Sequence, residues 1–135
     1  MQIPPADTPV VCDVSTADDS PVERLAEWQR LFGRMTGRER TESGIRFRFR
    51  ARDGLQAWIE DLAAREHACC AFMVFEVTPA GDEVHLDAAV SENDDARAVL
   101  EQFYELPETA AEDPAALAGR YRSTGLQFVN GDPSA

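Results

Sequence analysis

Cys69 and Cys70 are adjacent thiols at the end of a run with helical spacing, and Glu66 lies one turn before them. At about 100° per residue, Glu66 and both cysteines fall within about 60° of Leu55 on the predicted helix, so all three share its apolar face. Buried carboxylates are rare unless they are paired or coordinate something. The stretch therefore predicts a site that combines thiols with an acid.

Cys12 is the third cysteine, and it lies in the middle of a predicted strand over residues 10–14. Adjacent cysteines in one helix point about 100° apart. They chelate one ion comfortably only if the helix unwinds there, or if a third ligand from another element meets one of them. Cys12 could supply that ligand, which gives a site of three thiolates, or of two thiolates with Glu66.

Soft thiolates prefer thiophilic ions, so the pattern predicts binding of zinc, mercury, cadmium or copper(I), or of a metalloid such as arsenite. The role would be that of a sensor, carrier or buffer. His67, Phe72 and Met73 are the neighbours expected to support the ligands. Tetrahedral zinc would want a fourth ligand, but both imidazoles are expected on the surface, His67 off the apolar helix face and His85 on the solvent side of a strand.

Three cysteines are too few for a disulfide scaffold, so we expect reduced thiols. Two other functions remain open. The same atoms could form a thiol-dependent enzyme acting on an organometal or electrophilic substrate, with Glu66 as proton donor or acceptor. The cysteines could equally be small hydrophobic residues in the core of a protein-interaction domain.

The composition excludes several classes of function. With 135 residues and a net charge of −12, the chain should repel nucleic acid and anionic membranes. It has no glycine-rich phosphate loop, so no nucleotide cofactor is expected, and no helix-turn-helix pattern. The start has neither the basic region nor the apolar stretch of an export signal, which predicts a cytoplasmic protein. A protein partner or a homodimer remains open.

The predicted elements form one α+β domain over residues 10–104, after a flexible lead-in over 1–9 and before a partly ordered extension over 105–135. Ser20-Pro21-Val22-Glu23 has the pattern of a capping box, and Asp53 is a candidate N-cap for the cysteine-bearing helix. Ile45, Phe47 and Phe49 alternate with arginines, as in a half-buried strand. The predicted elements are strands over 10–14, 44–51, 72–78 and 83–90, helices over 21–36, 54–68 and 94–104, and in the extension a short helix from 113 and a docked segment at 126–129.

The order β-α-β-α-β-β-α predicts a two-layer sandwich, with four mostly antiparallel strands and the helices on one face. Its general architecture would be ferredoxin-like. Strand order does not follow from the sequence.

At these residues the chain resembles a small actinobacterial domain that occurs alone or fused behind DNA-binding domains of the mercury-resistance-regulator (MerR) type. The resemblance covers roughly residues 10–104 and rests on an E-x-x-C-C-x-F motif with a first-strand cysteine. The segments that carry the resemblance are Val11-Cys12-Asp13, Ala26-Glu27-Trp28-Gln29, Gly44-Ile45-Arg46-Phe47-Arg48-Phe49 and Leu62-Ala63-Ala64-Arg65-Glu66 before Cys69-Cys70-Ala71-Phe72. The resemblance implies sensing of heavy metals or thiol stress, with Glu66, Cys69, Cys70, Phe72 and Cys12 as the family's marked positions.

Overall fold

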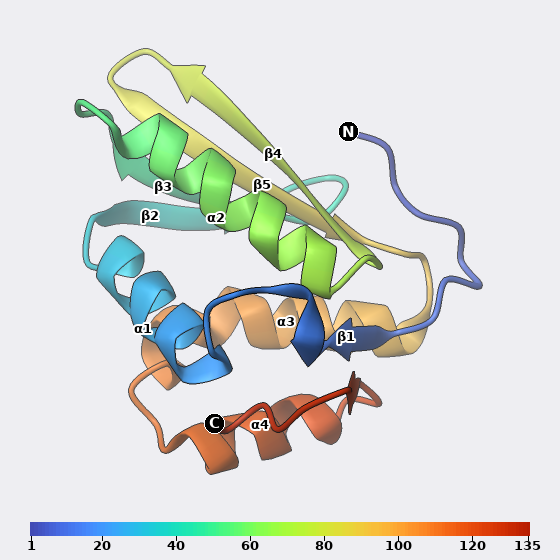
Figure 1. Ribbon diagram of the computed structural model, residues 1–135. Helices are drawn as coiled ribbons and strands as arrows, with labels where there is room; N and C mark the ends of the chain where they lie inside the picture. Colours follow the sequence, from blue (N-terminus) through green and yellow to red (C-terminus); the bar gives the residue numbers. More distant parts are fainter.

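A four-stranded antiparallel sheet in the order β2-β3-β5-β4 is the central layer of the computed structural model, which describes residues 1–135 (Figure 1). Helices α1, α2 and α3 pack on one of its faces, so the predicted α+β sandwich is confirmed. In chain order the elements are β1 Val11–Asp13, a 3₁₀ turn Val14–Thr16, α1 Pro21–Phe32, β2 Met35–Arg40, β3 Ile45–Arg50, α2 Leu55–Cys69, β4 Met73–Ala80, β5 Glu83–Val90, α3 Asp94–Thr109, α4 Pro114–Arg122 and β6 Gln127–Val129.

The side chains of strand β3 show which face of the sheet is buried and which is exposed. Ile45, Phe47 and Phe49 are buried, as their alternation predicts. Phe47 contacts Phe32 of α1 and Phe103 of α3, with ring centroids 5.2 Å and 5.5 Å away. The arginines of β3 lie on the opposite, open face, where Arg46 and Arg48 pair with acids of neighbouring strands, Arg46 with Asp87 at 2.7 Å.

The helix that follows Ser20 begins as predicted. The Ser20 hydroxyl accepts from the Glu23 backbone N–H at 3.1 Å, and the Glu23 carboxylate accepts from the Ser20 N–H at 2.9 Å. The N-cap predicted for α2 is wrong. Gly54 rather than Asp53 occupies that position, with φ at +79° and no side-chain hydrogen bond. A glycine adopts this left-handed conformation readily, so the chain turns into α2 without a side-chain cap.

Strand β2 was not expected from the sequence, and it takes the place that the strand at residues 10–14 was predicted to fill. Its residues lack apolar alternation. Arg38 and Arg40 point toward the helices, where their guanidinium carbons lie 4.8 Å and 4.4 Å from the Tyr104 ring centroid. Long arginine side chains can cover apolar surface while the charge stays in water, so this edge strand packs against α3 without any buried apolar residue of its own.

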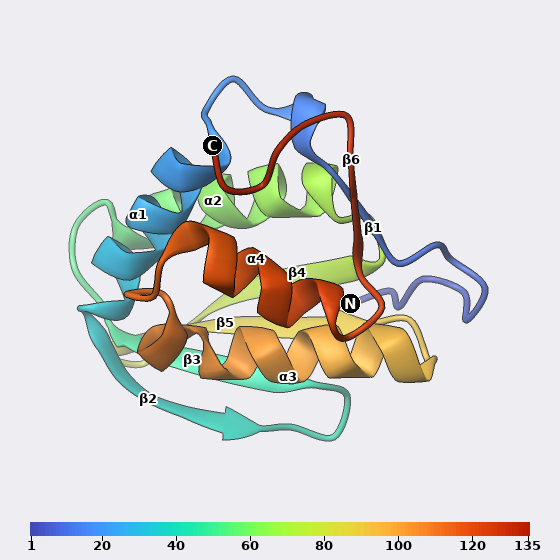
Figure 2. The ribbon, with the colours of Figure 1, turned by 90° about the horizontal axis from the view of Figure 1, so that it is seen from below.

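The two ends of the chain meet in a small parallel sheet. Strand β1 pairs with β6, and Cys12 lies opposite Phe128 in the register. Helix α4 precedes β6 and packs beside α3 (Figure 2). The C-terminal extension therefore contributes ordered structure next to one of the cysteines. None of the helices has the length and apolar character required to cross a membrane.

Candidate functional site

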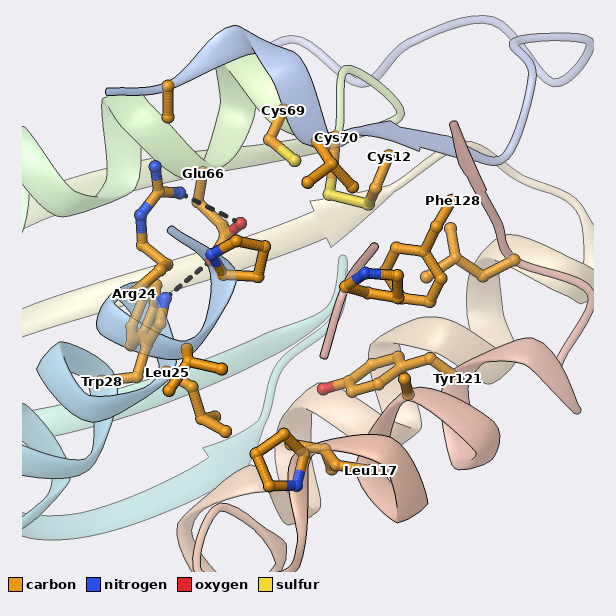
Figure 3. Close-up of a pocket in the computed structure, with 18 of the residues that line it drawn as sticks. Cys12, Arg24, Leu25, Trp28, Glu66, Cys69, Cys70, Leu117, Tyr121 and Phe128 are labelled. Carbon is orange, nitrogen blue, oxygen red and sulfur yellow. Dashed lines mark hydrogen bonds and ion pairs between the residues drawn. A yellow bond between two sulfur atoms is a disulfide. The ribbon is translucent and has the colours of Figure 1, made fainter. Parts of the chain in front are cut away.

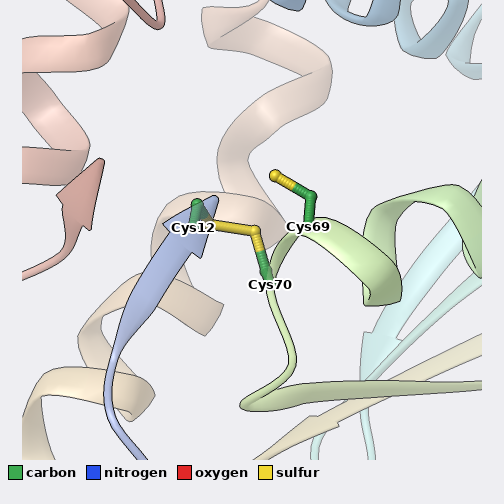
Figure 4. A group of neighbouring side chains, drawn as sticks. All are labelled: Cys12, Cys69 and Cys70. Carbon is green, nitrogen blue, oxygen red and sulfur yellow. A yellow bond between two sulfur atoms is a disulfide. The ribbon is translucent and has the colours of Figure 1, made fainter. Parts of the chain in front are cut away.

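The C-terminal end of α2 separates the two adjacent cysteines. Cys69 is the last helical residue, whereas Cys70 has φ −122° and ψ 79° and has left the helix. Its N–H still donates to the Glu66 carbonyl at 2.8 Å, and its own carbonyl accepts from Met73 N–H at 3.0 Å in the turn to β4. Because the helix unwinds at Cys70, both thiols can point toward the same neighbour, β1 (Figure 4).

The three cysteine sulfurs form one cluster in which every pair lies within 4.8 Å. The predicted convergence of Cys12, Cys69 and Cys70 is therefore observed. The expectation of three reduced thiols is wrong for this structure, because Cys12 and Cys70 form a disulfide and only Cys69 is free. Cys12 on β1 lies beside the end of α2, although 58 positions separate it from Cys70, and this places the two sulfurs within bonding distance.

The remaining thiol, Cys69, is half-buried at this junction. Burial, together with the nearby Glu66 carboxylate, raises its pKa to about 11. Cys69 is thus a neutral thiol at neutral pH, poorly suited to attack a substrate without a metal ion to displace its proton.

We expect the alkylation of Cys69 in the unreduced protein to show this pKa directly. Since the thiolate is the reacting form, the rate should rise about tenfold per pH unit and level off only near pH 11, whereas an unperturbed thiol levels off near pH 8.5. Iodoacetamide labelling followed by mass spectrometry measures the rate. A plateau at pH 8 to 9 would contradict the assigned environment.

Glu66 lies on the inner side of α2, as its helix position predicts, and its side chain is 18% exposed. One carboxylate oxygen accepts from the Trp28 indole N–H at 2.7 Å, and the other lies 3.5 Å from the Arg24 guanidinium. Burial raises the pKa of Glu66, and Arg24 and Trp28 act against this by stabilising the ionised form. The carboxylate is thus bound by α1 rather than by the sulfur cluster.

Replacing Trp28 with phenylalanine tests this arrangement. The variant loses ring volume in the core and leaves a carboxylate oxygen without its donor, so the free energy of unfolding should fall by about 2–3 kcal/mol. The indole N–H stabilises the ionised carboxylate, so the loss should be larger at pH 8 than at pH 5. Urea unfolding at both pH values measures it. An equal loss at the two pH values would show that the hydrogen bond contributes nothing.

A cavity of about 180 Å³ adjoins the sulfurs and Glu66, and 17 of the 25 residues that line it are hydrophobic. Leu25 of α1, Leu117 and Tyr121 of α4 and Phe128 of β6 point toward it (Figure 3). The Tyr121 hydroxyl faces the open space, and burial raises its pKa. The sulfur cluster therefore opens onto an apolar space built largely by α1 and the C-terminal elements.

The other predicted site residues have different places. Met73 lines the cavity, whereas Phe72 is fully buried in the core. The exposed His67 places its Nδ1 2.7 Å from the Met73 carbonyl. His85 is 3.2 Å from Glu83 in the sheet. Neither imidazole belongs to the sulfur cluster.

Two residues of the site, Arg24 and Trp28, were not predicted as site residues, although Trp28 belongs to one of the motifs quoted for the resemblance. They lie four positions apart on α1, so they share one face of that helix. Arg24 is only 8% exposed and also binds Asp19, through contacts of 2.6 Å and 2.8 Å. The sequence does contain a hint of this pair, because Arg24 lies one helical turn before Trp28 on the apolar face of an amphipathic helix.

Comparison of the chain with protein-family models, with curated proteins and with solved structures gives no match. The geometry of the site is therefore what indicates a function for this protein.

Proposed function

We propose that the reduced protein binds one soft metal ion or metalloid through the thiolates of Cys12, Cys69 and Cys70. The observation that carries this proposal is the cluster of three sulfurs, all within 4.8 Å of one another, brought together from β1 and the end of α2. Three thiolates converging on one point form a donor set that selects soft ions over magnesium or calcium.

The surroundings favour some soft ions over others. Structural zinc is almost always four-coordinate, and neither histidine adjoins the sulfurs as a fourth donor. The Glu66 carboxylate is engaged by Trp28 and Arg24. A site limited to three sulfurs suits ions that accept a three-thiolate environment, so we expect cadmium, mercury, copper(I) or arsenite to bind in preference to zinc.

The disulfide makes binding depend on the redox state. Joining Cys12 to Cys70 removes two of the three donors, because a disulfide sulfur carries no thiolate charge. The oxidised protein then retains Cys69 alone. A sensor, carrier or buffer for a thiophilic ion would thus operate only where the pair is reduced. The resemblance of the cysteine motif to domains fused to MerR-type regulators supports the sensing role.

A titration with Cd(II) tests the proposal. The reduced protein should bind one equivalent, with a thiolate-to-metal charge-transfer band, and should release protons because the thiols must ionise. The same protein with the Cys12–Cys70 disulfide intact is the matched control and should show a much weaker band. Absence of any saturable band from the folded, reduced protein would overturn the proposal.

A further inference from the structure

The cavity beside the sulfurs is larger and more apolar than a bare metal ion requires. Its volume is about 180 Å³, and 17 of its 25 lining residues are hydrophobic. Cavities of roughly 150 Å³ lined by aliphatic and aromatic side chains can bind benzene. The space next to Cys69 is therefore of the size and polarity to hold a small hydrocarbon group.

Much of the apolar wall of this cavity comes from elements that do not carry the cysteine pair. Leu25 projects from α1, Leu117 and Tyr121 from α4, and Phe128 from β6, and Figure 3 shows them facing the same space as Cys69. An apolar group in this space would lose contact with water on several sides. A ligand anchored at the sulfur would therefore gain affinity from its organic part.

We propose that the site binds mono-organometal cations, in which the metal bonds to the Cys69 sulfur and the organic group occupies the apolar cavity. This inference deepens the proposed function, since it assigns an organic substituent to the same site. In the reaction, the S–H bond of Cys69 and the bond between the metal and its halide break, and a sulfur–metal bond forms. The thiol proton and the halide leave to solvent, and no atom changes oxidation state.

Charge favours this class of ligand. A thiolate and a monocation form a neutral adduct, which an apolar cavity accepts, whereas a bare divalent ion on Cys69 alone would leave a positive charge beside apolar walls. Arg24 lies 3.5 Å from the Glu66 carboxylate and makes shorter contacts with Asp19, so part of the negative charge beside the cavity is already neutralised. One thiolate is sufficient for such a cation, and Cys69 is free even when the disulfide is present.

The test compares phenylmercury with methylmercury on the reduced full chain, each in competition with 2-mercaptoethanol. Each cation forms the same kind of sulfur–mercury bond with the competitor, so the strength of that bond drops out of the comparison. The preference that remains measures the contribution of the cavity. We expect phenylmercury to be preferred over methylmercury by about tenfold or more, because the ring buries more apolar surface. Equal affinities of the two cations would overturn the inference.

Variants test whether the phenyl preference arises in this cavity and at Cys69. Ala118 is buried and lines the cavity, so Ala118→Leu should remove the phenyl preference, while Ala116→Leu, on the exposed side of the same helix, should keep it. Cys69→Ala should also remove the preference. Persistence of the preference in either Ala118→Leu or Cys69→Ala would contradict the assignment. If Ala118→Leu does not fold, Leu25→Phe narrows the same space and should give the same result.

Cd(II) binding, measured on the same samples, separates the two proposals. Unchanged Cd(II) affinity in the Ala118→Leu variant shows that the three-sulfur site and the fold are intact. A phenyl preference without Cd(II) binding would uphold the organic-group site and overturn the three-thiolate proposal. Cd(II) binding without a phenyl preference would do the reverse.

Discussion

Serine in place of Cys12 should lower the Cd(II) affinity of the reduced protein by at least about a hundredfold, because one of the three soft donors becomes a hydroxyl that binds this ion poorly. The same loss is expected for Cys69→Ser and Cys70→Ser, since each sulfur lies within 4.8 Å of the other two. Isothermal titration in the presence of a non-thiol reductant measures the affinities.

The matched control for these variants is Ala68→Ser. Ala68 is exposed on α2 next to Cys69, so the substitution adds a hydroxyl near the site without removing a donor. Its Cd(II) affinity should equal that of the unmodified protein. Retention of full affinity in Cys12→Ser would show that the pair at the end of α2 binds the ion without β1, and would reduce the site to two sulfurs.

Reduction of the Cys12–Cys70 disulfide should lower the free energy of unfolding by about 4 kcal/mol, the loss of chain constraint expected for a loop closed by residues 58 positions apart. The effect would be large because the bond ties β1 to the end of α2, and β1 in turn pairs with β6. Chemical unfolding of the protein with and without reductant measures the difference.

Two variants decide whether this loss belongs to the disulfide. Cys69→Ser retains the bond and should lose the same stability on reduction, whereas Cys12→Ala has no disulfide and should be insensitive to reductant. Saturating Cd(II) should return stability to the reduced protein, because a ligand that binds only the folded state stabilises it by mass action. Equal unfolding curves with and without reductant would show that the pair is not oxidised in solution.

The parts of this fold that could be predicted are those encoded locally. The capping box at Ser20 and the alternation of Ile45, Phe47 and Phe49 depend on neighbouring residues, and both are observed. Strand β2 could not be predicted in this way. Its inward-facing side chains are Arg38 and Arg40, which cover Tyr104 with their length rather than with apolar character.

For the site, helical spacing was enough to place Glu66, Cys69 and Cys70 on one face, because those positions lie on one element. Helical spacing could not predict which residue each of these groups bonds to. The disulfide depends on how β1 lies against the end of α2, and β1 itself pairs in parallel with β6 from the other end of the chain. The bonds of Glu66 to Trp28 and Arg24 depend on how α1 packs against α2, and periodicity within one helix carries no information about that packing.

The central claim is that three thiols bind one ion, and counting reactive thiols with and without metal tests it most directly. After full reduction and removal of the reductant under nitrogen, the folded protein should show three thiols that react with a disulfide reagent. One equivalent of Cd(II) should protect all three, and a chelator should restore their reactivity. Protection of fewer than three thiols, or the same reactivity with and without Cd(II), would contradict the account.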